Sequence, residues 1–252
     1  MLRNKLSDEL AIFFAAYNFP DYCPNGLQVA GSDEINTIVS GVSANQALID
    51  EAIETEADAI LVHHGFFFKG EMLEIVEIKK NRIAALLQNN ISLFAYHLPL
   101  DLHPEIGNNV LFGNAMGWLQ QDVFALLGVA SLGRSTILSN PIMANELTAT
   151  LTAVLDREPL HIAPDDNREI KKIAWCTGAA QDGIRDAYLQ GADAYLSGEV
   201  SERTFSAAKE YGLHYFACGH HATERFGVRA LGEYCATQYG LQHVFIDIVN
   251  PV

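Results

Sequence analysis

Apolar and polar positions follow two alternating patterns along the chain. Short runs of consecutive apolar residues, typical of strands buried in a sheet, are separated by longer amphipathic segments typical of helices. In the first half, we expect strands at 37–42, 58–62 and 91–96, and helices at 7–17, 45–54 and 79–88. In the second half, we expect strands at 173–176, 194–197, 213–218 and 243–249, and helices at 144–155, 183–190 and 225–239.

This alternation of strands and helices predicts an α/β fold whose sheets are largely parallel or mixed. Between residues 117 and 134 the pattern weakens, and we place a domain boundary near residue 125. We therefore expect two α/β parts, one on each side of that boundary.

An internal repeat relates the two halves. Residues 38–62 align without gaps to residues 173–197 at an offset of 135, with nine of 25 positions identical. Both copies contain Ala-Asp-Ala-x-Leu at the second strand. Chance similarity between two strand–helix–strand units is the alternative, and we favour a duplicated α/β module.

Composition and charge argue against two classes of partner, nucleic acids and membranes. The formal net charge of −15, with only 16 scattered basic residues among 252, disfavours nucleic acid. No apolar run approaches the length of a membrane span, and the N-terminus does not resemble a signal peptide, so we expect a cytoplasmic protein without a membrane partner. The four cysteines form no CxxC pair and are interpreted as buried or half-buried thiols in a reducing compartment.

Histidine follows the apolar strand at 58–62. His63 and His64 stand at its carboxyl end, where α/β sheets carry their functional groups. A turn at Gly65 would allow both side chains to approach one site. Imidazole suits Zn, Fe, Mn or Co. For this pair alone, one histidine in the core and one on the surface is an equally good interpretation.

Two further strand ends favour a metal site. The strand at 91–96 is followed by His97 and Asp101, and the strand at 213–218 by His220 and Glu224. When the repeat alignment is resumed after a gap, His97 matches His220 and Asp101 matches Glu224. If the sheets are parallel, these ends share one side. Two carboxylates suggest more than one ion, although the residues alone leave one metal or two open.

Five motifs, taken in order along the chain, resemble one known family. They are Asn25-Gly26-Leu27-Gln28-Val29, Val62-His63-His64-Gly65, His97-x-x-x-Asp101, Gly107-Asn108-Asn109 and Gly219-His220-x-x-Thr223-Glu224. Each is weak alone, but the ordered set is similar to the Nif-three-like family, and closest to its short bacterial members. That family comprises the GTP cyclohydrolase 1 type 2 homologues, also called dinuclear-metal-centre hexameric proteins. The resemblance covers nearly the whole chain from about residue 20.

The resemblance carries expectations about fold and site. It implies two intertwined α/β domains made of related repeats, which we take as 1–124 with 219–252, carrying the metal site, and 125–218. It also implies a homohexameric ring. Two divalent metal ions per subunit would be bound by His63, His64, Asp101, His220 and Glu224, with Glu224 as the bridge.

Two further residues are expected close to the metal site. His97 lies close to the site in the family pattern, and we interpret it as a proton-transfer group or a neighbour of the ligands; plain structural packing is the alternative. Glu199 stands at the matching strand end of the second repeat and could line the cavity or lie exposed.

Two functional hypotheses follow. The first is a metal-dependent hydrolase acting on a nucleotide such as GTP. The sequence has no P-loop and no basic cluster to explain triphosphate binding. The second hypothesis is therefore a non-catalytic role in metal binding, metal storage or as a scaffold ring.

Overall fold

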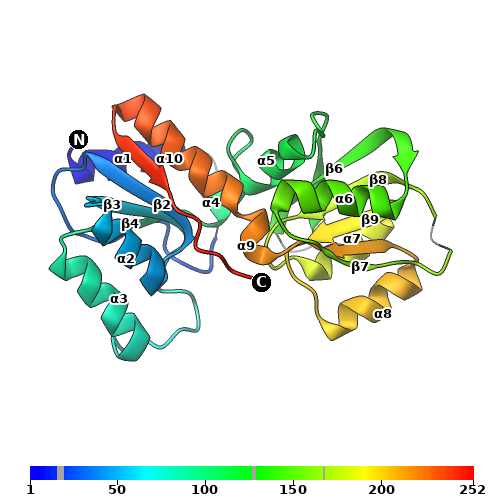
Figure 1. Ribbon diagram of the computed structural model, residues 1–252, viewed down its shortest axis with the longest axis horizontal. Helices are drawn as coiled ribbons and strands as arrows, with labels where there is room; N and C mark the ends of the chain where they lie inside the picture. The colour runs from blue at the N-terminus through cyan, green and yellow to red at the C-terminus, as the bar shows by residue number, and fades with distance from the viewer. Residues whose placement is uncertain (16–19, 127–128, 167) are drawn as a thin grey trace. The chain divides into compact units, whose positions relative to one another are not determined.

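The computed structural model describes residues 1–15, 20–126, 129–166 and 168–252. The chain divides into two compact units, and each unit is built around one β-sheet (Figure 1). The first unit comprises residues 1–106 and 225–249, and the second comprises residues 107–224 and 250–252. No helix in these described ranges combines the length and the hydropathy needed to cross a membrane.

The first unit contains a five-stranded mixed sheet in the order β1-β4-β3-β2-β11. Strands β2, β3, β4 and β11 are parallel, and β1 pairs antiparallel with β4 at one edge. The strands are β1 (Gly26–Val29), β2 (Thr37–Ser43), β3 (Ala59–His64), β4 (Ser92–Ala95) and β11 (Gln242–Phe245). The helices are α1 (Arg3–Phe13), α2 (Gln46–Glu54), α3 (Glu77–Gln88), α4 (Leu98–Asp101) and α10 (Arg225–Tyr239).

Helices cover both faces of the first sheet. Side chains alternate between the two faces of a strand, so Leu61 packs with residues of α1 and α10, whereas Ile60 packs with residues of α2 and α3. Burial on both faces explains why the two neighbouring strands β3 and β4 consist mainly of apolar residues without a polar alternation. Functional groups on these strands can therefore only stand at the strand ends.

The second unit contains a six-stranded mixed sheet in the order β5-β6-β8-β9-β10-β7. Strands β8, β9 and β10 are parallel, and the others pair antiparallel. The strands are β5 (Asp122–Leu126), β6 (Val129–Ile142), β7 (Leu160–Ile162), β8 (Ile170–Cys176), β9 (Ala194–Ser197) and β10 (His214–Ala217). The helical segments are α5 (Asn108–Ala115), α6 (Ala144–Leu155), η2 (Gln181–Gly183), α7 (Ile184–Leu189), α8 (Glu202–Tyr211) and α9 (His220–Thr223).

The two sheets share a strand arrangement. In the first, the order β1-β4-β3-β2 places an antiparallel strand beside three parallel ones, and β7-β10-β9-β8 repeats this order in the second. Ile38 pairs with Ala59, and at the offset of 135 Ile173 pairs with Ala194. The predicted α/β class with mixed sheets is therefore confirmed.

Most of the predicted elements are present, with differences at their ends. The helix predicted at 7–17 begins earlier, at Arg3, and the end predicted for it at Tyr17 lies outside the described residues. The predictions omitted β1, β5, β6, β7, α4, α5, α8 and α9. Except for α8, these elements are short, lie at a sheet edge or include polar positions, so they do not form apolar runs.

The compact units divide at positions different from the predicted domain boundaries near residues 125 and 219. The first unit ends at Ile106. Helix α5 packs against β6, and β5 pairs with β6. These contacts place residues 107–124 with the second sheet. At the other boundary, α9 belongs to the second unit and α10 to the first, so the division falls between Glu224 and Arg225.

Candidate metal centre

The first unit gathers three histidines at one edge of its sheet. His63 and His64 are the last residues of β3, and His97 follows β4, which is the parallel neighbour of β3. Because parallel strands end at the same edge, the three side chains come together. One ligand nitrogen from each lies within 4.8 Å of the others, as required of a metal-binding group.

His63 is oriented as a metal ligand. Its side chain is fully buried, and its Nδ1 lies 3.0 Å from the carbonyl oxygen of Tyr96. A carbonyl only accepts, so Nδ1 carries the proton and the neutral ring keeps its lone pair on Nε2. Nε2 lies 3.6 Å from Oδ2 of Asp101, which α4 presents. A histidine that binds a metal through one ring nitrogen usually donates the N–H of its other ring nitrogen to an acceptor, as Nδ1 of His63 does to the Tyr96 carbonyl.

His64 and Asp101 complete the predicted residues of this unit. Nδ1 of His64 lies 3.0 Å from the hydroxyl oxygen of Ser43, the residue paired with it on β2. The Asp101 side chain is only 9% exposed. Burying a carboxylate is costly unless a cation or hydrogen-bond donors stabilise it, and imidazole and carboxylate together are a common donor set for divalent metals. These donors therefore fit a metal ion.

Asp21 holds His97, a role that the sequence did not indicate. Oδ1 of Asp21 lies 2.7 Å from Nδ1 of His97, and Oδ2 accepts hydrogen bonds from Leu98 N and from the side chain of Asn25. Burial would raise the pKa of Asp21, but the hydrogen bonds to His97 and Asn25 lower it to about 2. The carboxylate stays ionised and accepts a hydrogen bond from Nδ1 of His97, which fixes the orientation of the imidazole ring.

The second unit holds the other two predicted residues. Nε2 of His220 lies 3.0 Å from Oε2 of Glu224, and Nδ1 lies 2.7 Å from Oε1 of Glu199. Burial would lower the pKa of His220, but hydrogen bonds and charge from Glu224, and then from Glu199, raise it to about 9. Two carboxylates around one imidazole leave an excess of negative charge, which a divalent cation would neutralise.

Two glycines make room for this group, and sequence reasoning missed both. A Cβ on Gly178, whose φ is +69°, would overlap Oε1 of Glu224. A Cβ on Gly198 would come within 2.6 Å of the carbonyl oxygen of Gly178 and 2.7 Å of Cα of His220. Each glycine is needed because residues far away in the sequence lie where its Cβ would be. No local sequence motif therefore identifies either glycine.

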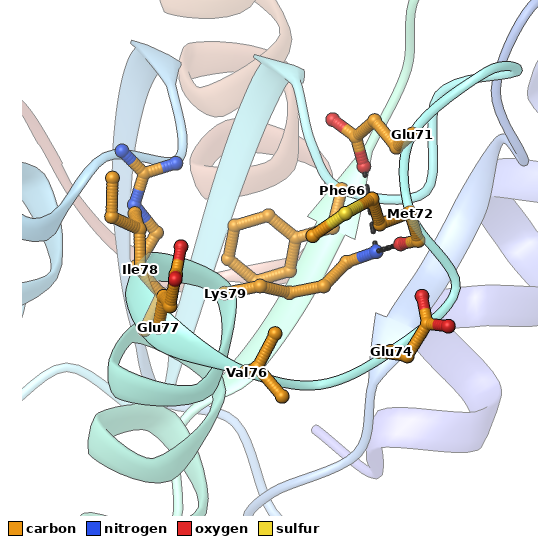
Figure 2. A pocket seen from close by; sticks show the side chains of 9 residues that line it. Phe66, Glu71, Met72, Glu74, Val76, Glu77, Ile78 and Lys79 are labelled. Carbon is orange, nitrogen blue, oxygen red and sulfur yellow. Dashed lines mark hydrogen bonds and ion pairs between the residues drawn. The ribbon is translucent and has the colours of Figure 1, made fainter.

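The segment after His64 carries exposed apolar side chains beside a pocket. Phe66 is buried and lines this pocket with Met72, Val76 and Lys79 (Figure 2). Lys79 donates to the carbonyl oxygen of Met72 and lies over the ring of Phe67. Residues Phe66 to Phe68 are thus part of a loop that directly follows the two histidines at the end of β3.

The predicted ligands therefore fall into two groups, one in each unit. His63, His64 and Asp101, with His97 beside them, belong to the first, and His220 and Glu224 to the second. Each group combines imidazole with carboxylate and is mostly buried. Fold and donor set together define an α/β protein with two mixed sheets and histidine–carboxylate clusters able to hold metal ions.

Comparison with known proteins identifies the family. Residues 1–251 match the Duf34/NIF3 (NGG1p interacting factor 3) family, and the chain belongs to it. It is 47% identical over 246 residues to the GTP cyclohydrolase 1 type 2 homolog of Pseudomonas aeruginosa, covering 98% of this chain and 97% of that protein. It is 49% identical over 237 residues to the protein of the same name from Vibrio cholerae, covering 92% of each.

Solved structures agree with this assignment. The structure of protein ybgI, described as of unknown function, superposes with a TM-score of 0.92 at 42% identity, covering all of both chains. The family predicted from the five motifs is therefore confirmed, as is the arrangement of α/β units with mixed sheets.

Proposed function

We propose that the chain is a metal-dependent hydrolase that binds two divalent ions through His63, His64, Asp101, His220 and Glu224. Three imidazoles and two carboxylates suit Zn, Fe, Mn or Co. Glu224, with two oxygens and a side chain only 4% exposed, is the residue proposed to bridge the ions. Bound ions of this kind lower the pKa of water and polarise the group that is attacked.

One observation carries the proposal. The fully buried ring of His63 donates Nδ1–H to the Tyr96 carbonyl and directs Nε2 toward the Asp101 carboxylate. A buried histidine with a purely structural role needs no carboxylate on its second nitrogen. This arrangement of acceptor, imidazole and carboxylate is the one in which protein scaffolds hold metal ligands.

His97 is proposed to hold and transfer a proton. Asp21 keeps its Nδ1 protonated, and its ring lies 5.0 Å from that of His63 and 5.6 Å from that of His64, measured between centroids. Nε2 of the neutral ring can therefore accept a proton beside the proposed ligands. The role requires the fixed orientation that Asp21 provides.

The proposed substrate is a nucleotide such as GTP, as the names of the curated relatives suggest. A specific observation favours the non-catalytic alternative of metal binding or storage. Glu199 and Glu224 both face His220, so this part of the proposed site repels phosphate groups unless bound cations neutralise it. The substrate assignment therefore depends on the metals being bound first.

Metal analysis tests the site and an activity assay tests the reaction. We expect about two ions per native chain, and fewer in both His64→Ala and Glu224→Gln. Glu202→Gln, which changes an exposed glutamate on α8, is the matched control and should keep the native content. Full occupancy in Glu224→Gln would contradict the bridging role.

The same samples separate an enzyme from a metal store. Metal-dependent hydrolysis of GTP should be present in the native chain and in Glu202→Gln, and reduced at least tenfold in the two site variants. Equally low hydrolysis in all four proteins, with native metal content in the controls, would favour the non-catalytic alternative.

We also propose that the two units arose by duplication of one α/β module. The matching strand orders and the common pairing offset of 135 support this. So does a shared contact: Asp58 accepts hydrogen bonds from the backbone N–H groups of residues 36 and 37, and Asp193 accepts them from those of residues 171 and 172.

A further inference from the structure

A second group of metal-ligating side chains lies behind His97. β1 runs antiparallel to β4, with Gly26 paired to Ala95, so the chain just before β1 lies beside the chain just after β4. This pairing places the loop that carries Asp21 and Cys23 next to His97. One ligand atom each from Asp21, Cys23 and His97 lies within 4.8 Å of the others.

The carboxylate of this group is already oriented. Oδ2 of Asp21 accepts hydrogen bonds from Nδ2 of Asn25 at 2.8 Å and from Leu98 N at 3.0 Å, while Oδ1 faces His97. The Asp21 side chain is only 3% exposed. Carboxylates that bind metals are held in the same way, by hydrogen bonds on the oxygen that does not face the ion.

The thiol of Cys23 adds a ligand that the proposed dinuclear site does not have. Cys23 is buried, and burial, with the charges of Asp21 and Glu71, raises its pKa to about 12. These conditions keep the thiol protonated in the absence of a cation. A divalent ion would reverse the balance, because a coordinating thiol loses its proton to the metal. The negative surroundings that suppress the thiolate also attract the ion.

We propose that Asp21, Cys23 and His97 form a third metal site, distinct from the five-residue site, that takes a thiophilic divalent ion such as Zn²⁺. Oxygen, sulfur and nitrogen donors are the usual ligands of four-coordinate zinc, with water in the remaining position. Ligand atoms of a tetrahedral zinc site lie on the order of 3.5 Å apart. Oδ1 of Asp21 and Nδ1 of His97, now 2.7 Å apart, therefore separate slightly around the ion, and the Cys23 thiol within 4.8 Å of them supplies the third ligand.

His97 connects this site with the other histidines. The same residue belongs to the group of His63 and His64 and to the group of Asp21 and Cys23. An ion bound in the third site would replace the proton on Nδ1 of His97, which is now hydrogen-bonded to Oδ1 of Asp21. Occupancy of the third site therefore replaces the hydrogen bond to Asp21 that orients His97, without removing any of the five proposed ligands.

Cobalt absorption tests the third site directly. Co²⁺ is the probe because thiolate ligation gives a near-ultraviolet charge-transfer band, which histidine and carboxylate ligands do not produce. We expect the native chain to show this band, and Cys23→Ser to lose it. Cys235→Ser removes another buried thiol of the same unit and should keep the band. His64→Ala should also keep it, because His64 is not part of the group formed by Asp21, Cys23 and His97.

The outcomes separate this site from the proposed dinuclear site. Visible Co²⁺ absorption without the charge-transfer band in the native chain would overturn the third site and leave the dinuclear site standing. Persistence of the band in Cys23→Ser would also overturn it. Conversely, the band with no other bound cobalt would support the third site alone.

A variant that leaves all three ligands in place provides an independent check. Asn25→Ala removes the amide that anchors Oδ2 of Asp21. We expect its Co²⁺ affinity, read from the charge-transfer band, to fall roughly tenfold to a hundredfold, as for other changes next to metal ligands. An unchanged affinity would contradict the proposed ligand role of Asp21.

Discussion

The carboxyl ends of β3 and β9 occupy equivalent places in the two units but carry different chemistry. β3 ends in His63 and His64, and the residues at the offset of 135 after β9 are Gly198 and Glu199. In the first unit the strand end itself supplies imidazoles. In the second, Gly198 leaves space for the backbone of His220, and Glu199 hydrogen-bonds that imidazole. One arrangement of strands thus carries two different sets of side chains at its carboxyl ends.

The comparison shows which position each unit uses for its histidine. Both units place a histidine after the last parallel strand of the repeat, His97 after β4 and His220 after β10. A carboxylate hydrogen-bonds Nδ1 of each ring, from Asp21 in the first unit and from Glu199 in the second. Orientation of an imidazole by a carboxylate is therefore common to both units, although the carboxylate comes from a different part of the chain.

Filling the space at Gly198 should have the largest effect on this comparison. In Gly198→Ala, the added Cβ meets the backbone of Gly178 and His220, which cannot move aside as a flexible side chain would. We expect a loss of about 1–3 kcal/mol in the free energy of unfolding, together with reduced metal content. Urea denaturation and elemental analysis measure the two effects.

A glycine in open space provides the control for Gly198→Ala. Gly191 has a φ of +71°, and no atom of the described residues lies within 4 Å of the position that a Cβ would take there. Gly191→Ala therefore tests backbone strain without crowding and should keep the native metal content. Native metal content in Gly198→Ala would show that the second unit does not need the space that distinguishes it from the first.

The paired aspartates test how alike the units are. Asp58→Ala and Asp193→Ala each remove a carboxylate that accepts two backbone N–H groups at the start of a neighbouring strand. We expect each to cost about 0.5–1.5 kcal/mol of stability, because water reaches these contacts, and urea denaturation measures the loss. Similar losses of stability in the two variants would support the proposed duplication. A loss in one variant with none in the other would show that the shared contact stabilises only one of the two units.

A histidine pair in the second unit should give the smallest effect. Nε2 of His161 lies 3.0 Å from Nδ1 of His214. Burial, and then the charge of His214, lower the pKa of His161 to about 4, and burial lowers that of His214. Because the unfolded pKa is about 6.5, the folded state loses stability as the pH falls from about 6.5 towards 4.

Replacing one of these histidines checks the sign of that effect. His161→Gln keeps a hydrogen-bonding group but does not titrate, so its melting temperature should fall less than that of the native chain over this range, by roughly 2–4 °C. Thermal denaturation at pH 7 and pH 4.5 measures the difference. A larger fall in the variant would contradict burial of the neutral histidine pair.

The fold was largely accessible from the sequence because buried parallel strands are short apolar runs. Residues 58–62 and 194–197 were predicted as strands for this reason, and both lie in the centre of their sheets. β6 was not predicted, because polar residues such as Arg134, Ser135 and Thr136 interrupt its apolar positions. Domain boundaries were also displaced, since they depend on which sheet a connecting element packs against.

The candidate site could be proposed from the sequence where histidines follow strands directly. His63, His64, His97 and His220 stand next to apolar runs, and this local pattern indicated them. Asp21 was missed because its role comes from the pairing of β1 with β4, which joins residues 76 positions apart. Gly178 was missed because its importance lies in the absence of a side chain near Glu224.

The discontinuity of the first unit has a consequence for the order of events during synthesis. Its sheet contains β11, which pairs with β2, and its core contains residues of α10, yet both elements come from the last part of the chain. The second unit is continuous apart from residues 250–252. On the ribosome, the second sheet therefore has all its strands available first, and the first sheet is completed only after β11 has been synthesised.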